Sequence, residues 1–330
     1  MARLPIVYLQ RHNFFKTVTS NQSIGVRICD VYPERTISNR FSIKVIDPNY
    51  IPSLPRGVEE RVRETWGRFT AENPRAHDGS VLYIESYDWE GKPENGSIRG
   101  DVRIAPYRYT RHFARDSAGI VDKSNGDDQR LFPLTTWVLL SSSREPYAFF
   151  GYKKDYGVHV VSGFGSGMTS RDVHEEPKKT LEKHLQGVFD RELGKIGERI
   201  DGMFTFGLNY SPSVEPTGPQ RNTIGPREFD ILCHVTVDGD RETIMRLMKA
   251  NEQFTEELIA VPLHQEGLFS FLQNPRFKPT KSCIAGTVAH VLSKHDKKEH
   301  QRVLEDYGRL GGMTIELLDP PLYGPVDERT

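Results

Sequence analysis

GVHVVSGFGSG (157–167) and HLQGVFDRELGKIG (184–197) predict a strand, a glycine-rich turn and an amphipathic helix, in that order along the chain. The first stretch starts with β-branched residues and ends in glycines, which is typical of a strand that enters a tight turn. Glu176-Pro177 indicates the start of the helix, because proline fits the first helical position. One face of the expected helix carries Leu181, Leu185, Val188, Phe189, Glu192 and Ile196.

Regular elements are expected on both sides of this unit. The expected strands cover residues 134–142, 147–154, 202–210, 229–238 and 257–263, which are rich in β-branched and aromatic residues. The expected helices cover residues 240–251, 266–273 and 279–293. Strands that alternate with helices predict an α/β domain with helices packed against a sheet.

The N-terminal part predicts a smaller α+β region. Apolar residues at helical spacing indicate a helix over 58–74, and a β-rich run follows at 80–89. Residues 101–115 are expected to continue as a strand into a basic, aromatic segment, and 116–130 has the composition of an exposed connection. We therefore expect an N-terminal α+β extension over 1–124 and an α/β domain over 125–330.

Composition limits the classes of function. Apolar residues make up 36% of the 330 residues and charged residues 27%, so the chain can bury a core. The formal net charge of -1 gives no electrostatic signal for nucleic acid. No run of apolar residues indicates a signal peptide or a membrane span, so a cytoplasmic location without a membrane partner is expected. The three cysteines are spaced unlike a disulfide framework or a zinc site and are expected to be buried.

The order of elements, together with Arg191-Glu192-Leu193 after the glycine turn, resembles the Nudix superfamily. The resemblance covers residues 134–293. Upstream, Arg61, Trp66, Pro74 and Asp78-Gly79 are similar to the N-terminal extension of the branch that includes UDP-sugar hydrolases. The resemblance implies an α/β/α sandwich with a mixed sheet. It also implies a ligand of the nucleoside-diphosphate type, because most members hydrolyse nucleoside diphosphates linked to another moiety.

The signature of that family, G-x5-E-x7-R-E-U-x-E-E-x-G-U, is only partly present here. Aligned on Arg191-Glu192-Leu193, the first acidic position holds Lys183, the paired acidic positions hold Lys195 and Ile196, and the later glycine position holds Glu198. In the family these carboxylates bind Mg²⁺ or Mn²⁺, which prefer oxygen ligands. The resemblance therefore implies a degenerate site, in which no metal or other cofactor is expected.

An active enzyme would need substitute carboxylates and would use Mg²⁺ or Mn²⁺. Glu182 and Glu192 are the candidate catalytic residues for that alternative. The candidate metal ligands are Glu175, Glu176, Glu182, Glu192 and Glu257. Glu182, however, lies about 100° around the helix from the signature position at 183.

The expected helix also carries a basic stripe. Lys183, Gly187, Arg191 and Lys195 are spaced four residues apart and share one slowly drifting face. Ammonium and guanidinium groups can contact phosphate oxygens directly. The stripe is therefore a candidate binding surface for a nucleotide or another phosphorylated small molecule, and a solvated helix face is the alternative.

Two further segments are candidate ligand contacts. Gly163 and Gly165 would let backbone amides approach a phosphate, although glycines in a turn often serve only the backbone conformation. Tyr109 and Arg111, in PYRYTRHFAR (106–115), have the chemistry to stack on a base and to pair with phosphate, or to cover the core.

The histidines give no catalytic set. His234 lies in an apolar strand and is expected to be a core histidine, whereas His174 and His184 flank the signature and could line a pocket or lie on the surface. No GxSxG motif or comparable spacing indicates a nucleophile.

The sequence leaves three functions open. The first is a protein that binds a nucleoside-diphosphate-type ligand and has lost most metal-dependent hydrolysis. The second is an active, divergent Nudix pyrophosphohydrolase that acts on a nucleotide sugar or a dinucleotide. The third is a structural or protein-interaction module. The oligomeric state stays open.

Overall fold

The computed structural model describes residues 26–54, 57–74, 76–91, 96–113, 120–122, 129–155, 158–192, 194–211, 228–249, 257–277, 279–309 and 315–317. The strands are β1 (Val26–Thr36), β2 (Phe41–Asp47), β3 (Ser80–Glu90), β4 (Ser97–Pro106), β5 (Ile120–Asp122), β6 (Gln129–Ser142), β7 (Tyr147–Asp155), β8 (Val158–Ser162), β9 (Ile200–Ser211), β10 (Glu228–Val237), β11 (Glu257–Pro262) and β12 (Ile315–Leu317). The α-helices are α2 (Ile37–Arg40), α3 (Val58–Glu72), α4 (Tyr107–Phe113), α5 (Thr180–Glu192), α6 (Arg241–Lys249), α7 (Gln265–Gln273), α8 (Lys281–Leu292) and α9 (Lys297–Arg309). Short 3₁₀ helices cover Ser170–Asp172, Pro177–Lys179 and Gly194–Arg199.

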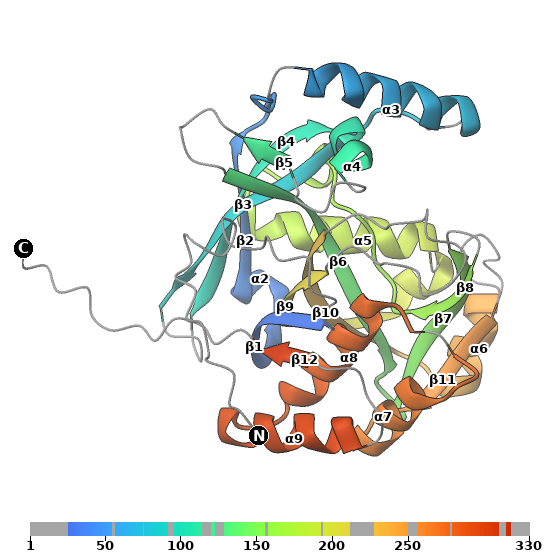
Figure 1. The fold of residues 1–330 in the computed structure, drawn as a ribbon. Helices are drawn as coiled ribbons and strands as arrows, with labels where there is room; N and C mark the ends of the chain where they lie inside the picture. The colour runs from blue at the N-terminus through green and yellow to red at the C-terminus, as the bar shows by residue number, and fades with distance from the viewer. Residues whose placement is uncertain are drawn as a thin grey trace, which may run out of the picture.

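In the described part of the chain, twelve strands form one connected mixed sheet (Figure 1). The main path has the order β12-β1-β9-β10-β6-β3-β4-β2, and β7 joins β6 to β8 and β11. β10 runs parallel to β6 and antiparallel to β9. The expected α/β class, with a large mixed sheet and surrounding helices, is confirmed.

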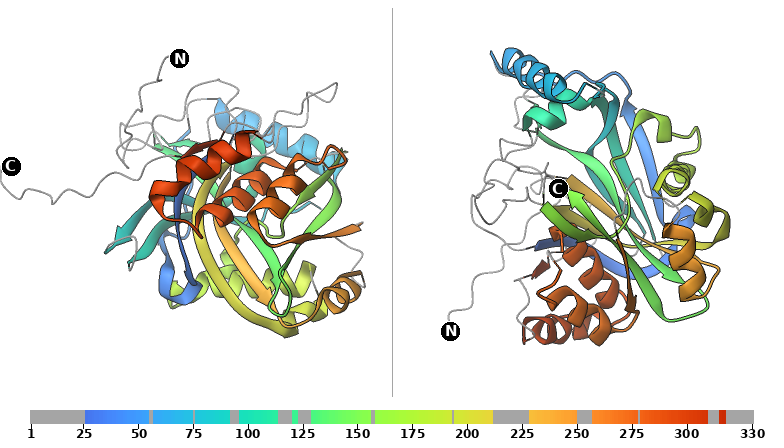
Figure 2. Two further views of the ribbon diagram at one scale, coloured as in Figure 1. Left: turned by 90° about the horizontal axis from the view of Figure 1, so that it is seen from below. Right: turned by 90° about the vertical axis from the view of Figure 1, so that its right-hand side faces the viewer.

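Helices cover both faces of this sheet (Figure 2). Leu134, Val138 and Leu140 of β6 pack in the same core cluster as residues of α5 and α6. Trp137 and Leu139, which alternate with them along the strand, pack with α7, α8 and α9 on the other face. Because both faces are buried, β6 and β10 consist mostly of apolar residues, which explains the uninterrupted runs seen in the sequence.

The N-terminal strands belong to the same sheet as the rest. β3 pairs with β6 through Tyr83 and Ile84, and β1 lies between β9 and β12. A third, smaller cluster under α3 and α4 includes Val62 and Tyr109. The expected boundary at 124/125 lies outside the described residues, and strands from both sides of it are hydrogen-bonded to one another.

Residues 107–113 differ from the expectation of a continuous strand. β4 ends at Pro106, and α4 follows it directly. Asp78 explains the turn into the helix, because its carboxylate accepts a hydrogen bond from the backbone N–H of Arg108 (2.8 Å) and pairs with the Arg108 guanidinium (2.7 Å). The basic, aromatic segment is therefore helical.

Cys29, Cys233 and Cys283 are all buried free thiols, as the sequence predicts. Burial raises the pKa of Cys283 to about 12, so this group is an inert thiol at neutral pH. Among the described residues, every helix is too short or too polar to cross a membrane.

Candidate functional site

The glycine turn lies against β6. Phe164 and Val138 exchange two backbone hydrogen bonds, of 2.7 and 3.0 Å. A Cβ atom at Gly163 would lie 2.6 Å from the carbonyl oxygen of Val138. Gly165 has φ +124°, and a Cβ there would lie 2.1 Å from the carbonyl oxygen of Thr136. Packing on β6 therefore requires glycine at both positions, whether or not a ligand binds nearby.

The apolar face of α5 is buried as expected, with Leu181, Leu185 and Phe189 fully covered. The helix ends at Glu192, and Gly194, with φ 54°, has the left-handed conformation that commonly terminates helices. Lys195 lies beyond this point, in the 3₁₀ helix Gly194–Arg199, and its side chain is outside the described part. The expected four-residue stripe is therefore continuous only from Lys183 to Arg191.

Lys183 and Arg191 lie exposed on α5 and are each tied to the segment that precedes the helix. The ammonium of Lys183 donates to the carbonyl oxygen of Val173 (2.9 Å), and Nη2 of Arg191 donates to Oγ of Ser166 (3.3 Å). Gly187 lies between them on the helix and has no side chain. Nη1 of Arg191 lies 3.3 Å from where a Cβ atom of Gly187 would be, so the guanidinium reaches back over this glycine.

The candidate carboxylates whose side chains the structure describes, Glu175, Glu176 and Glu182, do not form a ligand group on this surface. Glu176 is exposed and pairs with Lys179 (2.6 Å), and Glu182 is exposed. The side chains of Glu192 and Glu257 lie outside the described part of the structure. Among the described residues, no group of three His, Cys, Asp or Glu with metal-ligand spacing includes Glu175, Glu176 or Glu182.

Tyr109 lies in the small core under α3, where only 1% of its surface is exposed. Its hydroxyl donates to Oε2 of Glu59 (3.3 Å). Because the ring is covered, it has no free face on which a base could stack. Arg111 lies in α4, and its side chain is outside the described part.

His184 is fully buried rather than on the surface or in a pocket. Its Nδ1 lies 3.1 Å from Oδ2 of Asp172, and its Nε2 lies 3.0 Å from Oγ1 of Thr136. The hydroxyl, imidazole and carboxylate are connected as in a nucleophile–base–acid set. Since Thr136 is only 5% exposed, a substrate cannot reach its hydroxyl, and the network instead joins α5 to β6.

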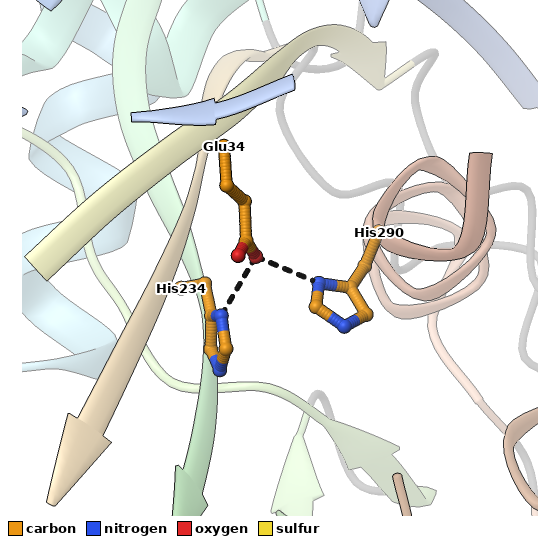
Figure 3. A group of neighbouring side chains, drawn as sticks. All are labelled: Glu34, His234 and His290. Carbon is orange, nitrogen blue, oxygen red and sulfur yellow. Dashed lines mark hydrogen bonds and ion pairs between the residues drawn. The ribbon is translucent and has the colours of Figure 1, made fainter. Parts of the chain in front are cut away.

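A second cluster joins β1, β10 and α8 (Figure 3). Oε1 of Glu34 lies 2.7 Å from Nδ1 of His234 and 3.1 Å from Nδ1 of His290. Its other oxygen, Oε2, accepts from the ammonium of Lys294. Nε2 of His234 lies 2.7 Å from Oγ of Ser141.

Irregular pairing of β1 brings Glu34 to this position. Between Val31 and Arg35 the register with β9 shifts, so the strand contains extra residues around Glu34. Such irregularities redirect a side chain from its regular place on the sheet. On the other strand, His234 alternates with Cys233 and Val235 and therefore faces α8, where His290 lies.

Burial sets the charge states of the cluster. Burial alone raises the pKa of Glu34, but hydrogen bonds from His234 and His290 outweigh it and hold that pKa well below its usual range. Burial lowers the pKa of His290 to about 4, against the opposing effect of its hydrogen bond to Glu34. At neutral pH the cluster thus contains a carboxylate beside a neutral imidazole. Perturbed groups of this kind often mark functional sites.

The sequence predicted His234 as a core histidine but did not connect it to Glu34 and His290. Glu34 lies in a stretch with no clear strand pattern, and His290 lies within an apolar helix. The three positions are far apart along the chain, and only the sheet order β1-β9-β10 brings them together. No local spacing could have revealed the cluster.

No protein-family model matches the chain, and no curated protein matches it significantly.

Proposed function

We propose that the chain binds a phosphorylated small molecule of the nucleoside-diphosphate type on the exposed face of α5, without a metal ion. The observation that carries the proposal is the pair of exposed cations, Lys183 and Arg191, on either side of Gly187. The resemblance to the Nudix superfamily suggested this helix as the ligand surface.

The dimensions accommodate an extended ligand. The Cα atoms of Lys183 and Arg191 are two helical turns apart, about 12 Å along the axis, and the Arg191 guanidinium reaches back over Gly187. A diphosphate with a nucleoside or sugar attached is long enough to contact both charged groups. Arg191 can bind phosphate through two parallel N–H groups, and Ser166 lies beside it as a further donor. Lys183 provides a single positive charge at the other end.

Loss of hydrolysis is supported by Ile196. This residue stands at one of the paired acidic positions of the family signature and is 1% exposed, packed in the core with α5. A carboxylate there would be buried in apolar surroundings, at a large cost in free energy. The buried position of Ile196 is therefore unsuited to a metal ligand.

A thermal-shift panel tests the proposal. UDP-glucose, ADP-ribose and nucleoside diphosphates are each added with Mg²⁺ and with EDTA, and the products are separated by chromatography. We expect stabilisation that survives EDTA and leaves the ligand intact; a ligand at a hundred times its Kd adds about 2.7 kcal/mol. Mg²⁺-dependent cleavage would instead identify a divergent hydrolase, and no stabilisation by any compound would contradict the proposal.

A further inference from the structure

Three potential metal ligands converge on the face of the sheet opposite α5. Oε1 of Glu34 and Nδ1 of His234 and of His290 all lie within 4.8 Å of one another (Figure 3). Within the described ranges, no other group of three His, Cys, Asp or Glu has this spacing. We infer that Glu34, His234 and His290 form a binding site for a divalent first-row transition metal, with Zn²⁺ as the reference ion.

The carboxylate oxygen lies slightly closer to each imidazole nitrogen than two ligands of one tetrahedral ion do. Metal–ligand distances of about 2.0–2.2 Å place neighbouring tetrahedral ligand atoms roughly 3.3–3.6 Å apart. The carboxylate oxygen lies 2.7 Å from the His234 nitrogen and 3.1 Å from the His290 nitrogen. In both imidazoles Nδ1 is the nitrogen beside this oxygen, and separations that grow by roughly half an ångström would admit the ion.

Ser141 provides the outer contact that a metal-bound histidine needs. Histidine ligands usually donate from their second ring nitrogen to an oxygen, which fixes the tautomer and the ring orientation. Nε2 of His234 lies 2.7 Å from Oγ of Ser141, which is 1% exposed. When Nδ1 binds the ion, Nε2 carries the proton and donates to this hydroxyl.

The donor set selects the class of ion. Imidazole nitrogens favour Zn²⁺, Co²⁺, Fe²⁺, Ni²⁺ and Cu²⁺, whereas Mg²⁺ and Ca²⁺ prefer all-oxygen sites. Three protein ligands leave at least one coordination position for water. Water has access from the side of Lys294, whose side chain is 48% exposed, while His234 and His290 are almost covered.

Lys294 is the group with which a cation must compete. Its ammonium contacts Oε2 of Glu34, the oxygen that faces away from the imidazoles, and so neutralises the carboxylate in the metal-free protein. Removing this charge while keeping a long apolar side chain should make the site more attractive to a cation. Lys294→Met is therefore expected to bind Zn²⁺ more tightly than the wild type.

The test is a Zn²⁺ titration of the full chain, stripped with EDTA and then freed of it, in competition with a chromophoric chelator. We expect one Zn²⁺ per chain, and a characteristic absorption band when Co²⁺ is used. Ser141→Ala should weaken binding roughly 10–100-fold. His290→Gln, which removes a ligand, should weaken it further.

A matched control is His295→Gln, which removes a nearby imidazole that contacts Glu299 rather than the cluster. This variant should bind Zn²⁺ like the wild type. Circular dichroism checks that every variant is folded, and tighter binding by Lys294→Met cannot result from misfolding. Absence of stoichiometric Zn²⁺ binding, or equal binding by His290→Gln and the wild type, would overturn the inference.

Discussion

At the residue scale, Gly165 is the position where the backbone tolerates no side chain. Its φ is +124°, and a Cβ atom there would approach the Thr136 carbonyl oxygen to 2.1 Å, so both the conformation and the space exclude alanine. We expect Gly165→Ala to destabilise the fold by about 3 kcal/mol or more. Gly167, in the same turn, has nothing within 4 Å of such an atom. Gly167→Ala should therefore change the free energy of unfolding by less than about 0.5 kcal/mol, as measured by urea denaturation; equal effects would contradict the assigned packing.

The Asp172–His184 pair predicts a pH dependence of stability. Burial alone raises the pKa of Asp172, but its hydrogen bonds to His184 and Thr169 outweigh it and lower that pKa. A carboxyl whose pKa is lower in the folded state than in the unfolded state stabilises the fold at pH values above its unfolded-state pKa of about 3.9. This contribution is lost as the pH falls through the folded-state pKa. Asp172→Asn should cost about 1–3 kcal/mol at pH 7.

Urea denaturation between pH 7 and pH 3 checks this expectation. The difference in stability between the wild type and Asp172→Asn should shrink as the pH falls below about 4. The control is Asp190→Asn, which removes an exposed carboxyl on α5, the helix of His184, where it contacts Gln186. It should stay within about 0.5 kcal/mol of the wild type. If Asp172→Asn were less stable than the wild type by the same amount at every pH, the charge of Asp172 would not contribute to the free energy of unfolding.

At the scale of elements, local pattern predicted the segments with a strong apolar period. α3, α6, α7 and α8 and the strands β3 and β6–β11 lie where the sequence placed them, and α5 does so except at its C-terminal end. α9 was missed because only Val303 and Tyr307 are buried on it. β1 was missed because Pro33 and several charged residues interrupt its apolar pattern. The end of α5 was misjudged because Gly194, not the apolar period, ends the helix.

These misses also limited what could be predicted of the site. The part of the stripe from Lys183 to Arg191 could be predicted from periodicity because one helix, α5, positions these residues, whereas Lys195 lies beyond its end. Glu34 lies on a strand that was missed, and its contact with His290 depends on how β1 and α8 meet around β9 and β10. A cluster assembled from three elements needs the tertiary topology, which the local pattern does not contain.

At the scale of the whole molecule, β1 joins the N-terminal part to the rest. It contributes Ile28 and Val31 to the core under α8, and the hydroxyl of Tyr32 lies 2.8 Å from Oγ1 of Thr205 on β9. The fragment 125–330 lacks this strand and leaves the edge of β9 unpaired. We expect that fragment to unfold without a cooperative thermal transition, whereas 26–330 should unfold cooperatively. Cooperative unfolding of 125–330 would show that the two parts fold independently.

Isothermal titration calorimetry in EDTA tests metal-free phosphate binding by α5 most directly. UDP-glucose and ADP-ribose are titrated into the wild type, into Lys183→Gln/Arg191→Gln, and into Lys298→Gln/Arg302→Gln, which removes the same charges from exposed positions of α9. Since a hydrogen bond to a charged group contributes about 1.5–3 kcal/mol, loss of both α5 cations should weaken binding roughly 100-fold or more. The α9 variant should bind like the wild type. Equal affinity in all three proteins, or no binding to any of them, would contradict the account.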